Sequence, residues 1–190
     1  MLSPLPKNGS ANQKECTVAL PFPLSADKIK NAEELAGIVA RRQASGERVV
    51  LTNGVFDILH VGHARYLAEA RALGDALVIA VNSDESVRGF KDSLRPIVPL
   101  AERIEMLASL SCVDYVAAFE TRTPAPLIER VRPAIYVKGG DYAEADLPEA
   151  AVVRGYGGDV QILSLVAGRS TTNIIARVCA AYGQNSEHTE

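Results

Sequence analysis

The sequence predicts an α/β protein with a Rossmann-like, open, parallel five-stranded sheet and helices on both faces. Short apolar runs such as 76–81 have no polar face, which is typical of strands buried on both sides. Segments with apolar residues at helical spacing alternate with these runs along the chain. Because strands that alternate with helices pair in parallel through right-handed crossovers, this order predicts the sheet.

The chain divides into three parts by composition. Residues 1–25 are rich in proline and polar side chains, which predicts a flexible arm. One domain is expected over 26–182, and the polar stretch 183–190 is expected to be a disordered tail. With 190 residues, of which 47% are apolar and 23% charged, the chain can form one proper core.

Composition also excludes several classes of protein. A net charge of −3 offers nucleic acid no electrostatic attraction. No apolar run approaches the roughly 18 residues of a membrane helix, and the N-terminus does not resemble a signal peptide. The three cysteines are scattered and predict no disulfide framework. We therefore expect a cytoplasmic protein that contacts neither nucleic acid nor membrane.

Each element is predicted from a local pattern. Strands are expected where short apolar runs are bounded by turn residues, at 49–51, 76–81, 113–119, 135–137 and 160–165. Helices are expected where apolar residues recur every three or four positions and where capping residues, glycine or proline mark the ends. They begin near Asp27, at His60, at Leu100, at Pro124 or Pro126, at Pro148 and at Ser170. The polar stretch 87–99 is expected to be a connection.

The stretch around the first strand carries the most chemistry. The strand runs into the turn Asn53–Gly54, and His60-Val-Gly-His63 then opens a helix. Free N–H groups and the positive end of the helix dipole favour an anion there, and Gly62 allows a phosphate or base to approach the backbone. Zinc would need more ligands than these two histidines. Helix-capping histidines are the simpler alternative, but the position after a strand and a glycine turn favours a phosphate site.

Polar residues after the second strand are placed near the same edge of the sheet. Asn82 and Asp84 follow that strand, and ligands of open α/β sheets bind beyond the carboxyl ends of strands. Lys91 and Arg95 lie on the next connection, where a lysine can hold phosphate oxygens as a mobile point charge. Arg103 begins a helix, the end that disfavours cations, which indicates either a ligand or a salt bridge to a neighbouring carboxylate.

Two later segments have the features of phosphate-binding loops. Lys138-Gly139-Gly-Asp141 follows the fourth strand, where glycine permits close approach and lysine supplies charge. Ser170 before an apolar periodic run is a helix N-cap, and a hydroxyl-rich helix start after a strand can also hold phosphate. The sequence contains neither a dinucleotide-binding glycine fingerprint after a strand nor a P-loop.

These segments together resemble the cytidylyltransferase-like nucleotidyltransferases. The run from Gly54 to His63 is similar to their first signature, and 170–172, Ser-Thr-Thr, to their second. More closely, 52–57, 81–84, 138–142 and 170–173 resemble the adenylyltransferase module of bacterial heptose-phosphate enzymes. The resemblance covers about 27–180 and implies the nucleotidyltransferase fold.

The resemblance implies transfer of AMP from ATP to D-glycero-D-manno-heptose 1-phosphate, giving ADP-heptose and pyrophosphate. It assigns catalysis to His60, His63 and Lys91. Nucleotide binding is expected at Asn53, Gly54, Val55, Phe56, Asp57, Gly62, Lys138, Gly139, Asp141, Ser170, Thr171 and Thr172. Substrate binding is expected at Asn82, Asp84, Arg95 and Arg103. Mg²⁺ would bind mainly through substrate phosphates, with no dedicated protein metal site.

The resemblance also implies partners and leaves two alternatives. The kinase domain that often precedes this module is missing from the sequence, so we expect a separate kinase upstream and, from family likeness, a homodimer. One alternative is another small-phosphate nucleotidyltransferase, such as a glycerol-3-phosphate cytidylyltransferase. The other is a module that binds adenine nucleotide without turnover.

Overall fold

A computed structural model of the chain describes residues 25–91, 93–140, 143–164, 166 and 168–183. Most of the predicted arm and tail, together with Asp141 and Leu165, lie outside the described residues. Among the described residues, no helix is long and apolar enough to cross a membrane.

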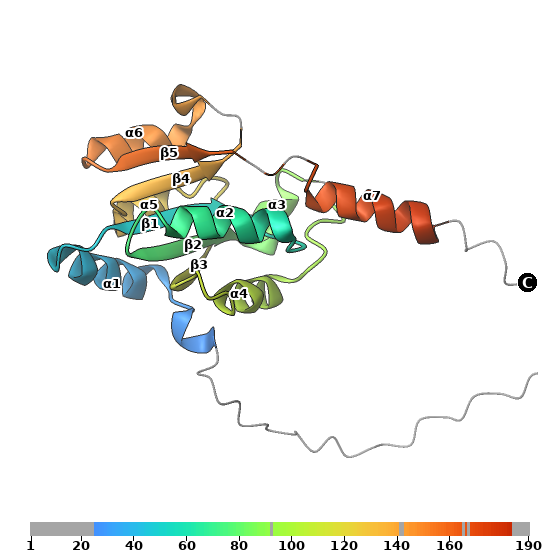
Figure 1. Ribbon diagram of the computed structural model, residues 1–190, viewed down its shortest axis with the longest axis horizontal. Coiled ribbons are helices and arrows are strands. Elements are labelled where there is room, and N and C mark those ends of the chain that lie inside the picture. The colour runs from blue at the N-terminus through green and yellow to red at the C-terminus, as the bar shows by residue number, and fades with distance from the viewer. Residues whose placement is uncertain (1–24, 92, 141–142, 165, 167, 184–190) are drawn as a thin grey trace, which may run out of the picture.

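Five parallel strands form one sheet in the order β3-β2-β1-β4-β5, which confirms the predicted fold class (Figure 1). The strands are β1 Val49–Gly54, β2 Ala76–Asn82, β3 Tyr115–Phe119, β4 Ile135–Gly139 and β5 Asp159–Leu163. The third strand begins later than predicted because Val113 N–H donates to Leu110 O in the preceding turn. The first and fourth strands are longer than the apolar runs that predicted them, because polar residues at their ends still pair.

The helices alternate with the strands as expected. They are α1 Ala32–Ala44, α2 Val61–Arg71, α3 Asp84–Arg88, α4 Leu100–Ala108, α5 Ala125–Val131, α6 Pro148–Gly155 and α7 Thr171–Tyr182, with 3₁₀ turns at Ser25–Lys28 and Glu144–Asp146. The first helix begins at Ala32 because Asn31 and Glu34 form a capping box. Helix α3 extends into the stretch 87–99 that was expected to be a connection; Ser83 Oγ accepts from Ser86 N–H and caps this short helix.

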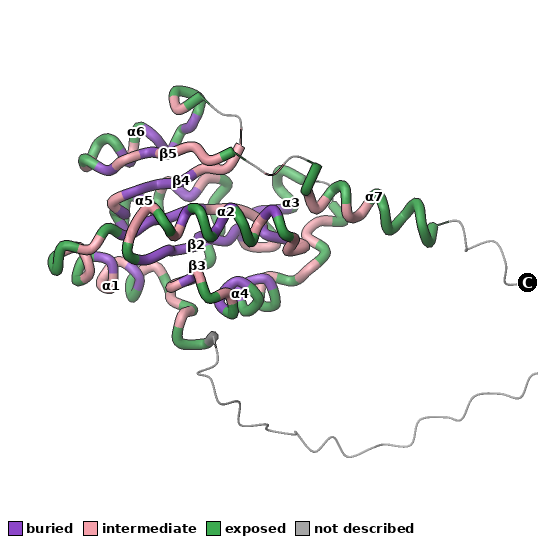
Figure 2. Tube along the Cα trace, viewed as in Figure 1, coloured by how far each residue is buried: buried purple, intermediate pink, exposed green. Residues whose placement is uncertain are grey.

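Two apolar layers cover the sheet. Side chains of α1, α5 and α6 pack on one face, and those of α2 and α4 pack on the other. Every residue of β2 is buried, as expected for an inner strand with helices on both sides (Figure 2). Helix α7 extends away from these layers, and none of its residues is buried (Figures 1 and 2).

The topology places a switch point between β1 and β4. The chain leaves β1 toward β2 and β3, and then crosses back to β4 and β5 on the other side. Connections on opposite faces separate at this switch point, where open α/β sheets bind ligands. All the strands are parallel, so their carboxyl ends lie at this same edge.

Candidate active site

The turn between β1 and α2 is held in a strained conformation. Phe56 is buried and has a φ of 49°, which is uncommon for a residue with a side chain. Its ring lies against Gly54, where a Cβ would come within 3.0 Å of the ring carbon Cε2. Glycine at 54 therefore makes room for Phe56, and Phe56 in turn contacts the edge of His63 at 5.3 Å between ring centroids.

The two histidines form one stacked pair at the start of α2. Their ring centroids are 3.8 Å apart and their planes differ by 16°. His60 is the N-cap residue, and its Nδ1 accepts a hydrogen bond from His63 N–H at 3.3 Å. A Cβ at position 62 would come within 2.9 Å of the His60 ring. Gly62 is therefore needed to seat this imidazole, a packing reason that the sequence alone did not reveal.

Both imidazoles are kept neutral at neutral pH. Burial, followed by the charge of His60, lowers the pKa of His63 to about 4. Burial, followed by the charge of Arg169, lowers the pKa of His60. His60 Nδ1 is an acceptor, and His63 Nδ1 is buried with no hydrogen-bond partner among the described residues. A proton on His63 Nδ1 would be a buried donor without an acceptor, and His60 Nδ1 already accepts a hydrogen bond. The proton of each neutral ring is therefore on Nε2, which is the donor.

The start of α7 lies beside this histidine pair. Thr171 Oγ1 donates to Ile58 O at 3.3 Å, which joins the two segments across 113 residues of sequence. Ser170 is the N-cap and accepts from Asn173 N–H at 3.1 Å, while Thr172 is exposed on the first turn. Two helix N-termini thus meet at one place, and each favours an anion.

Arg169 is a site residue that the sequence reasoning missed. A Cβ on Gly62 would come within 3.2 Å of Arg169 Cβ, so the arginine backbone lies directly over the histidine turn. Its side chain is exposed, and no described carboxylate pairs with it. A charged residue immediately before the N-cap Ser170 was the available signal.

Asp57, whose predicted contact with nucleotide stays a prediction, anchors a neighbouring connection. The carboxylate is buried and accepts hydrogen bonds from Ile97 N–H, from Val98 N–H at 2.8 Å and from Arg95 Nε at 2.5 Å. Burial opposes ionisation, but the two backbone donors and Arg95 together lower the pKa of Asp57. Asp57 and Arg95 therefore fix the connection after α3 to the histidine turn, and the substrate-binding role expected of Arg95 stays a prediction.

Arg103 also serves the fold, as the salt-bridge alternative predicted. Its guanidinium is fully buried and bonds Asp84 Oδ1 at 2.7 Å. It also donates to the carbonyl oxygens of Val55, Asn82 and Val98. The Asn82 side chain is buried and donates to Ser86 Oγ at 3.1 Å. Asn82, Asp84 and Arg103 thus join three segments that surround the site, and the substrate-binding roles expected of them stay predictions.

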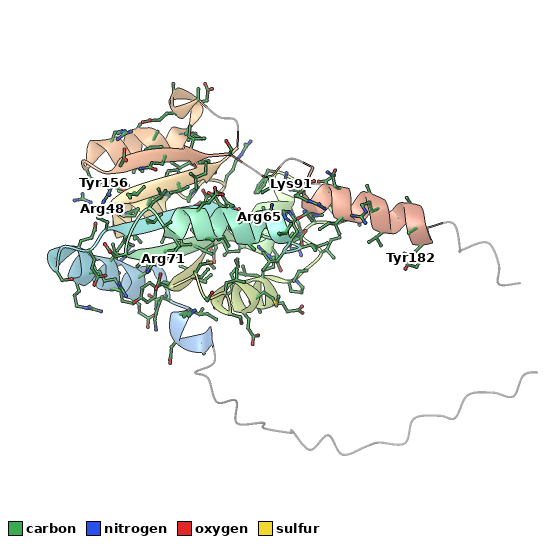
Figure 3. All side chains as sticks on the ribbon, viewed as in Figure 1. Arg48, Arg65, Arg71, Lys91, Tyr156 and Tyr182 are labelled. Atoms are coloured by element: carbon green, nitrogen blue, oxygen red, sulfur yellow. The ribbon has the colours of Figure 1, made fainter. Side chains whose placement is uncertain are left out.

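The remaining predicted residues lie at the same edge of the sheet. Lys91 is exposed just after α3, and no described residue accepts a hydrogen bond from its ammonium group; Figure 3 shows it at the end of the molecule where α7 begins. Lys138 and Gly139 end β4, next to Asn53 at the end of β1. Burial lowers the pKa of Lys138, and the charge of Glu149 offsets part of that shift.

Comparisons with known proteins agree with this geometry. Residues 51–177 match the family described as cytidylyltransferase-like. The chain is 52% identical over 157 residues to "Bifunctional protein HldE" of Geobacter sulfurreducens, covering 83% of this chain and 32% of that protein. It is 48% identical over 165 residues to the protein of the same name from Pelobacter propionicus, covering 87% and 34%. The chain therefore spans about a third of the length of these curated relatives.

A solved structure shares the fold. It is described as the lipopolysaccharide core biosynthesis protein from Thermoplasma volcanium and is 31% identical in sequence, with a TM-score of 0.54. The match covers 64% of this chain and 98% of that protein.

Proposed function

Since this chain belongs to the cytidylyltransferase-like family, we propose that it transfers AMP from ATP to D-glycero-D-manno-heptose 1-phosphate. The products are ADP-heptose and pyrophosphate. The observation that carries the proposal is the stacked His60–His63 pair at the start of α2, with the start of α7 and Arg169 beside it. Two helix N-termini, two Nε2–H donors and a free guanidinium together suit a polyphosphate.

The reaction needs positioning and charge neutralisation. A phosphate oxygen of the sugar phosphate forms a bond to the α-phosphorus of ATP, while the bond from that phosphorus to the bridging oxygen of the β-phosphate breaks. Pyrophosphate takes the electron pair and leaves in line. His60 and His63 donate from Nε2 to oxygens of the α- and β-phosphates, whose charge grows in the transition state. Lys91 holds phosphate oxygens of both reactants as a mobile cation.

The terminal phosphates are assigned to the start of α7. The first N–H groups of the helix, the hydroxyl groups of Ser170, Thr171 and Thr172, and Arg169 bind the β- and γ-phosphates. Asn53 and Lys138 bond each other at the ends of β1 and β4, and we assign this pair to the other reactant or to the α-phosphate. No carboxylate is needed as a base because the sugar phosphate is already an anion.

Mg²⁺ fits this arrangement as an ion held mainly by substrate oxygens. Among the described residues there is no group of three or more His, Cys, Asp or Glu side chains that could hold a metal ion. Asp57 and Asp84 are each paired with an arginine. When bound, Mg²⁺ supplies further neutralisation of phosphate charge.

We extend the proposal to the supply of sugar phosphate, the cellular compartment and the oligomeric state. A kinase must supply the sugar 1-phosphate, and we place both steps in the cytoplasm, where ATP is available. The protein acts as a homodimer, which light scattering at the assay concentration tests.

Pyrophosphate release with Mg²⁺ tests the function. ATP and CTP are each combined with heptose 1-phosphate and with glycerol 3-phosphate. Release only with ATP and heptose 1-phosphate is the expected result. Release with CTP and glycerol 3-phosphate would move the protein to a different substrate class. ATP binding without release in any combination would indicate a nucleotide-binding module.

We predict that His63→Ala lowers kcat by about 10²–10³, the usual effect of removing one electrostatic donor. The ring is only partly buried, so the variant is expected to fold, and circular dichroism checks this. Arg65→Ala, an exposed change later in α2, is the matched control and should leave kcat unchanged. Normal turnover by His63→Ala would contradict the assignment.

A further inference from the structure

Three polar side chains meet at the switch point between β1 and β4. Asn53 stands at the end of β1, and Tyr136 and Lys138 stand two residues apart on β4, so both point to the same face of the sheet. Tyr136 OH donates to Asn53 Oδ1 at 2.7 Å, and Lys138 Nζ donates to the same oxygen at 3.1 Å. Two donors from β4 therefore converge on one amide oxygen of β1.

This pairing determines which way the Asn53 amide faces. An ammonium group can only donate, so the atom facing Lys138 must be the amide oxygen and not the amide nitrogen. Both lone-pair positions of Oδ1 are then occupied, one by Tyr136 and one by Lys138. The nitrogen Nδ2 is turned away from both donors and bonds no described residue. The network thus fixes a rigid NH₂ donor at the edge of the sheet where ligands bind.

We propose that Tyr136 and Lys138 are positioning residues that hold Asn53 so that Nδ2 donates to a phosphate oxygen of a substrate. The inference rests on the proposed function and deepens it. The acceptor is an anionic oxygen because the ammonium group of Lys138 lies beside the amide. Tyr136 is fully buried and its hydroxyl donates to Asn53, so we assign it an indirect action on the substrate. The phosphate belongs either to ATP or to the sugar, and kinetics distinguish the two.

Asn53→Asp tests the donor directly. Aspartate keeps an oxygen that accepts from Tyr136 and pairs with Lys138, so the link between β1 and β4 is preserved. The NH₂ donor is lost, and a negative oxygen takes its place against the substrate phosphate. We expect kcat/KM to fall about 100-fold while Tm stays the same or rises. A purely structural role of Asn53 predicts no loss of activity.

Tyr136→Phe tests the positioning. The ring remains in the core, but Asn53 loses one of the two donors that orient it, and we expect a roughly 10-fold loss in kcat/KM. Tyr66→Phe is the matched control. Tyr66 is also a buried tyrosine whose hydroxyl bonds a β1 side chain, Thr52 Oγ1 at 2.6 Å, but from the opposite face of the sheet. The two variants should lose similar Tm, and Tyr66→Phe should keep kcat/KM within about two-fold.

The KM values identify the phosphate. A rise in KM for ATP alone places the amide on the nucleotide, and a rise for the sugar phosphate alone places it on the acceptor. Wild-type kinetics in Asn53→Asp would overturn the positioning role while leaving the function intact. If the wild-type protein releases no pyrophosphate, calorimetric titration with ATP and with the sugar phosphate asks the same question. Equal Kd values for wild type and Asn53→Asp would then overturn the inference.

Discussion

At the scale of the residue, the candidate site includes two cations that bond no other described side chain. Arg169 and Lys91 are exposed cations that pair with no described carboxylate, whereas Arg95 and Arg103 are committed to Asp57 and Asp84. The sequence offers no direct means of separating these two classes, because both consist of basic residues on predicted loops or helix ends. Arg169 and Lys91 can therefore bind a polyphosphate without breaking an ion pair among the described residues.

The position of Arg169 leads to a prediction about both binding and titration. Arg169→Ala should raise the KM for ATP about 10-fold, since one charged contact to phosphate is lost. It should also raise the pKa of His60, because the charge of Arg169 lowers that pKa in the native protein. Steady-state kinetics and NMR titration of the His60 ring measure the two effects. Arg177→Ala, on an exposed turn of the same helix, should change neither. An unchanged His60 pKa would contradict the contact.

At the scale of the element, the connection between α3 and α4 is held by one carboxylate. Asp57 accepts from the backbone of Ile97 and Val98 and from Arg95, which ties this polar stretch to the histidine turn. Backbone N–H groups in a connection have no ladder partner, so a buried side-chain acceptor supplies one. This connection also contains Lys91, so its order bears on the lysine that we propose as catalytic.

We predict that Asp57→Asn loosens this connection while the sheet stays intact. Asparagine retains one acceptor oxygen and introduces an NH₂ group facing donors. The amide protons of Ile97 and Val98 should exchange with solvent at least about ten-fold faster. Hydrogen exchange followed by NMR measures this, and the amide protons of β2 serve as the internal control. Unchanged exchange at both residues would show that Asp57 does not anchor the segment.

At the scale of the whole molecule, Arg103 joins segments that are distant in sequence. Its guanidinium bonds the β1–α2 turn, the end of β2, the start of α3 and the connection before α4. A planar group with several N–H donors can satisfy these acceptors together, which a lysine cannot. The segments around the site are therefore held together by one buried guanidinium group.

Removal of that charge should destabilise the protein strongly. We expect Arg103→Met to lower the free energy of unfolding by about 3 kcal/mol, because buried acceptors and Asp84 lose their donor. Arg130→Met is the control, since Arg130 forms an exposed ion pair with Glu33 and should change stability by less than about 1 kcal/mol. Urea denaturation of both variants measures the difference. Equal stabilities would contradict the role of Arg103.

The depressed histidine pKa values also affect stability as a function of pH. His63 titrates near 4 in the folded protein and near 6.5 when unfolded, so the unfolded chain binds the extra proton between these values. Stability should therefore fall as pH drops from about 6.5 to about 4. The fall in Tm between about pH 7 and about pH 5 should be smaller in His63→Gln. Asp57, whose pKa is lowered from 3.8, contributes only below this window. An identical pH slope for both proteins would contradict the shift.

The sequence by itself determined the sheet class, the alternation of elements and the two segments that form the histidine pair and the start of α7. Strand and helix periodicity, N-caps and glycine turns are local patterns, so they can be read without knowledge of distant contacts. Their positions directly after predicted strands also indicated that the candidate site lies beyond the carboxyl ends of the strands.

Which polar side chains bond other parts of the protein could be learned only from the folded structure. The partner of a charged side chain depends on segments far away in sequence: Asp57 is paired 38 residues away with Arg95, and Asn53 is bonded 83 residues away by Tyr136. The ligand contacts expected of Asp57, Arg95, Asn82, Asp84 and Arg103 stay predictions, but the bonds that hold these side chains within the protein could be identified only from the fold. For the same reason Arg169 and Tyr136 acquire their significance only from neighbours that the fold brings to them.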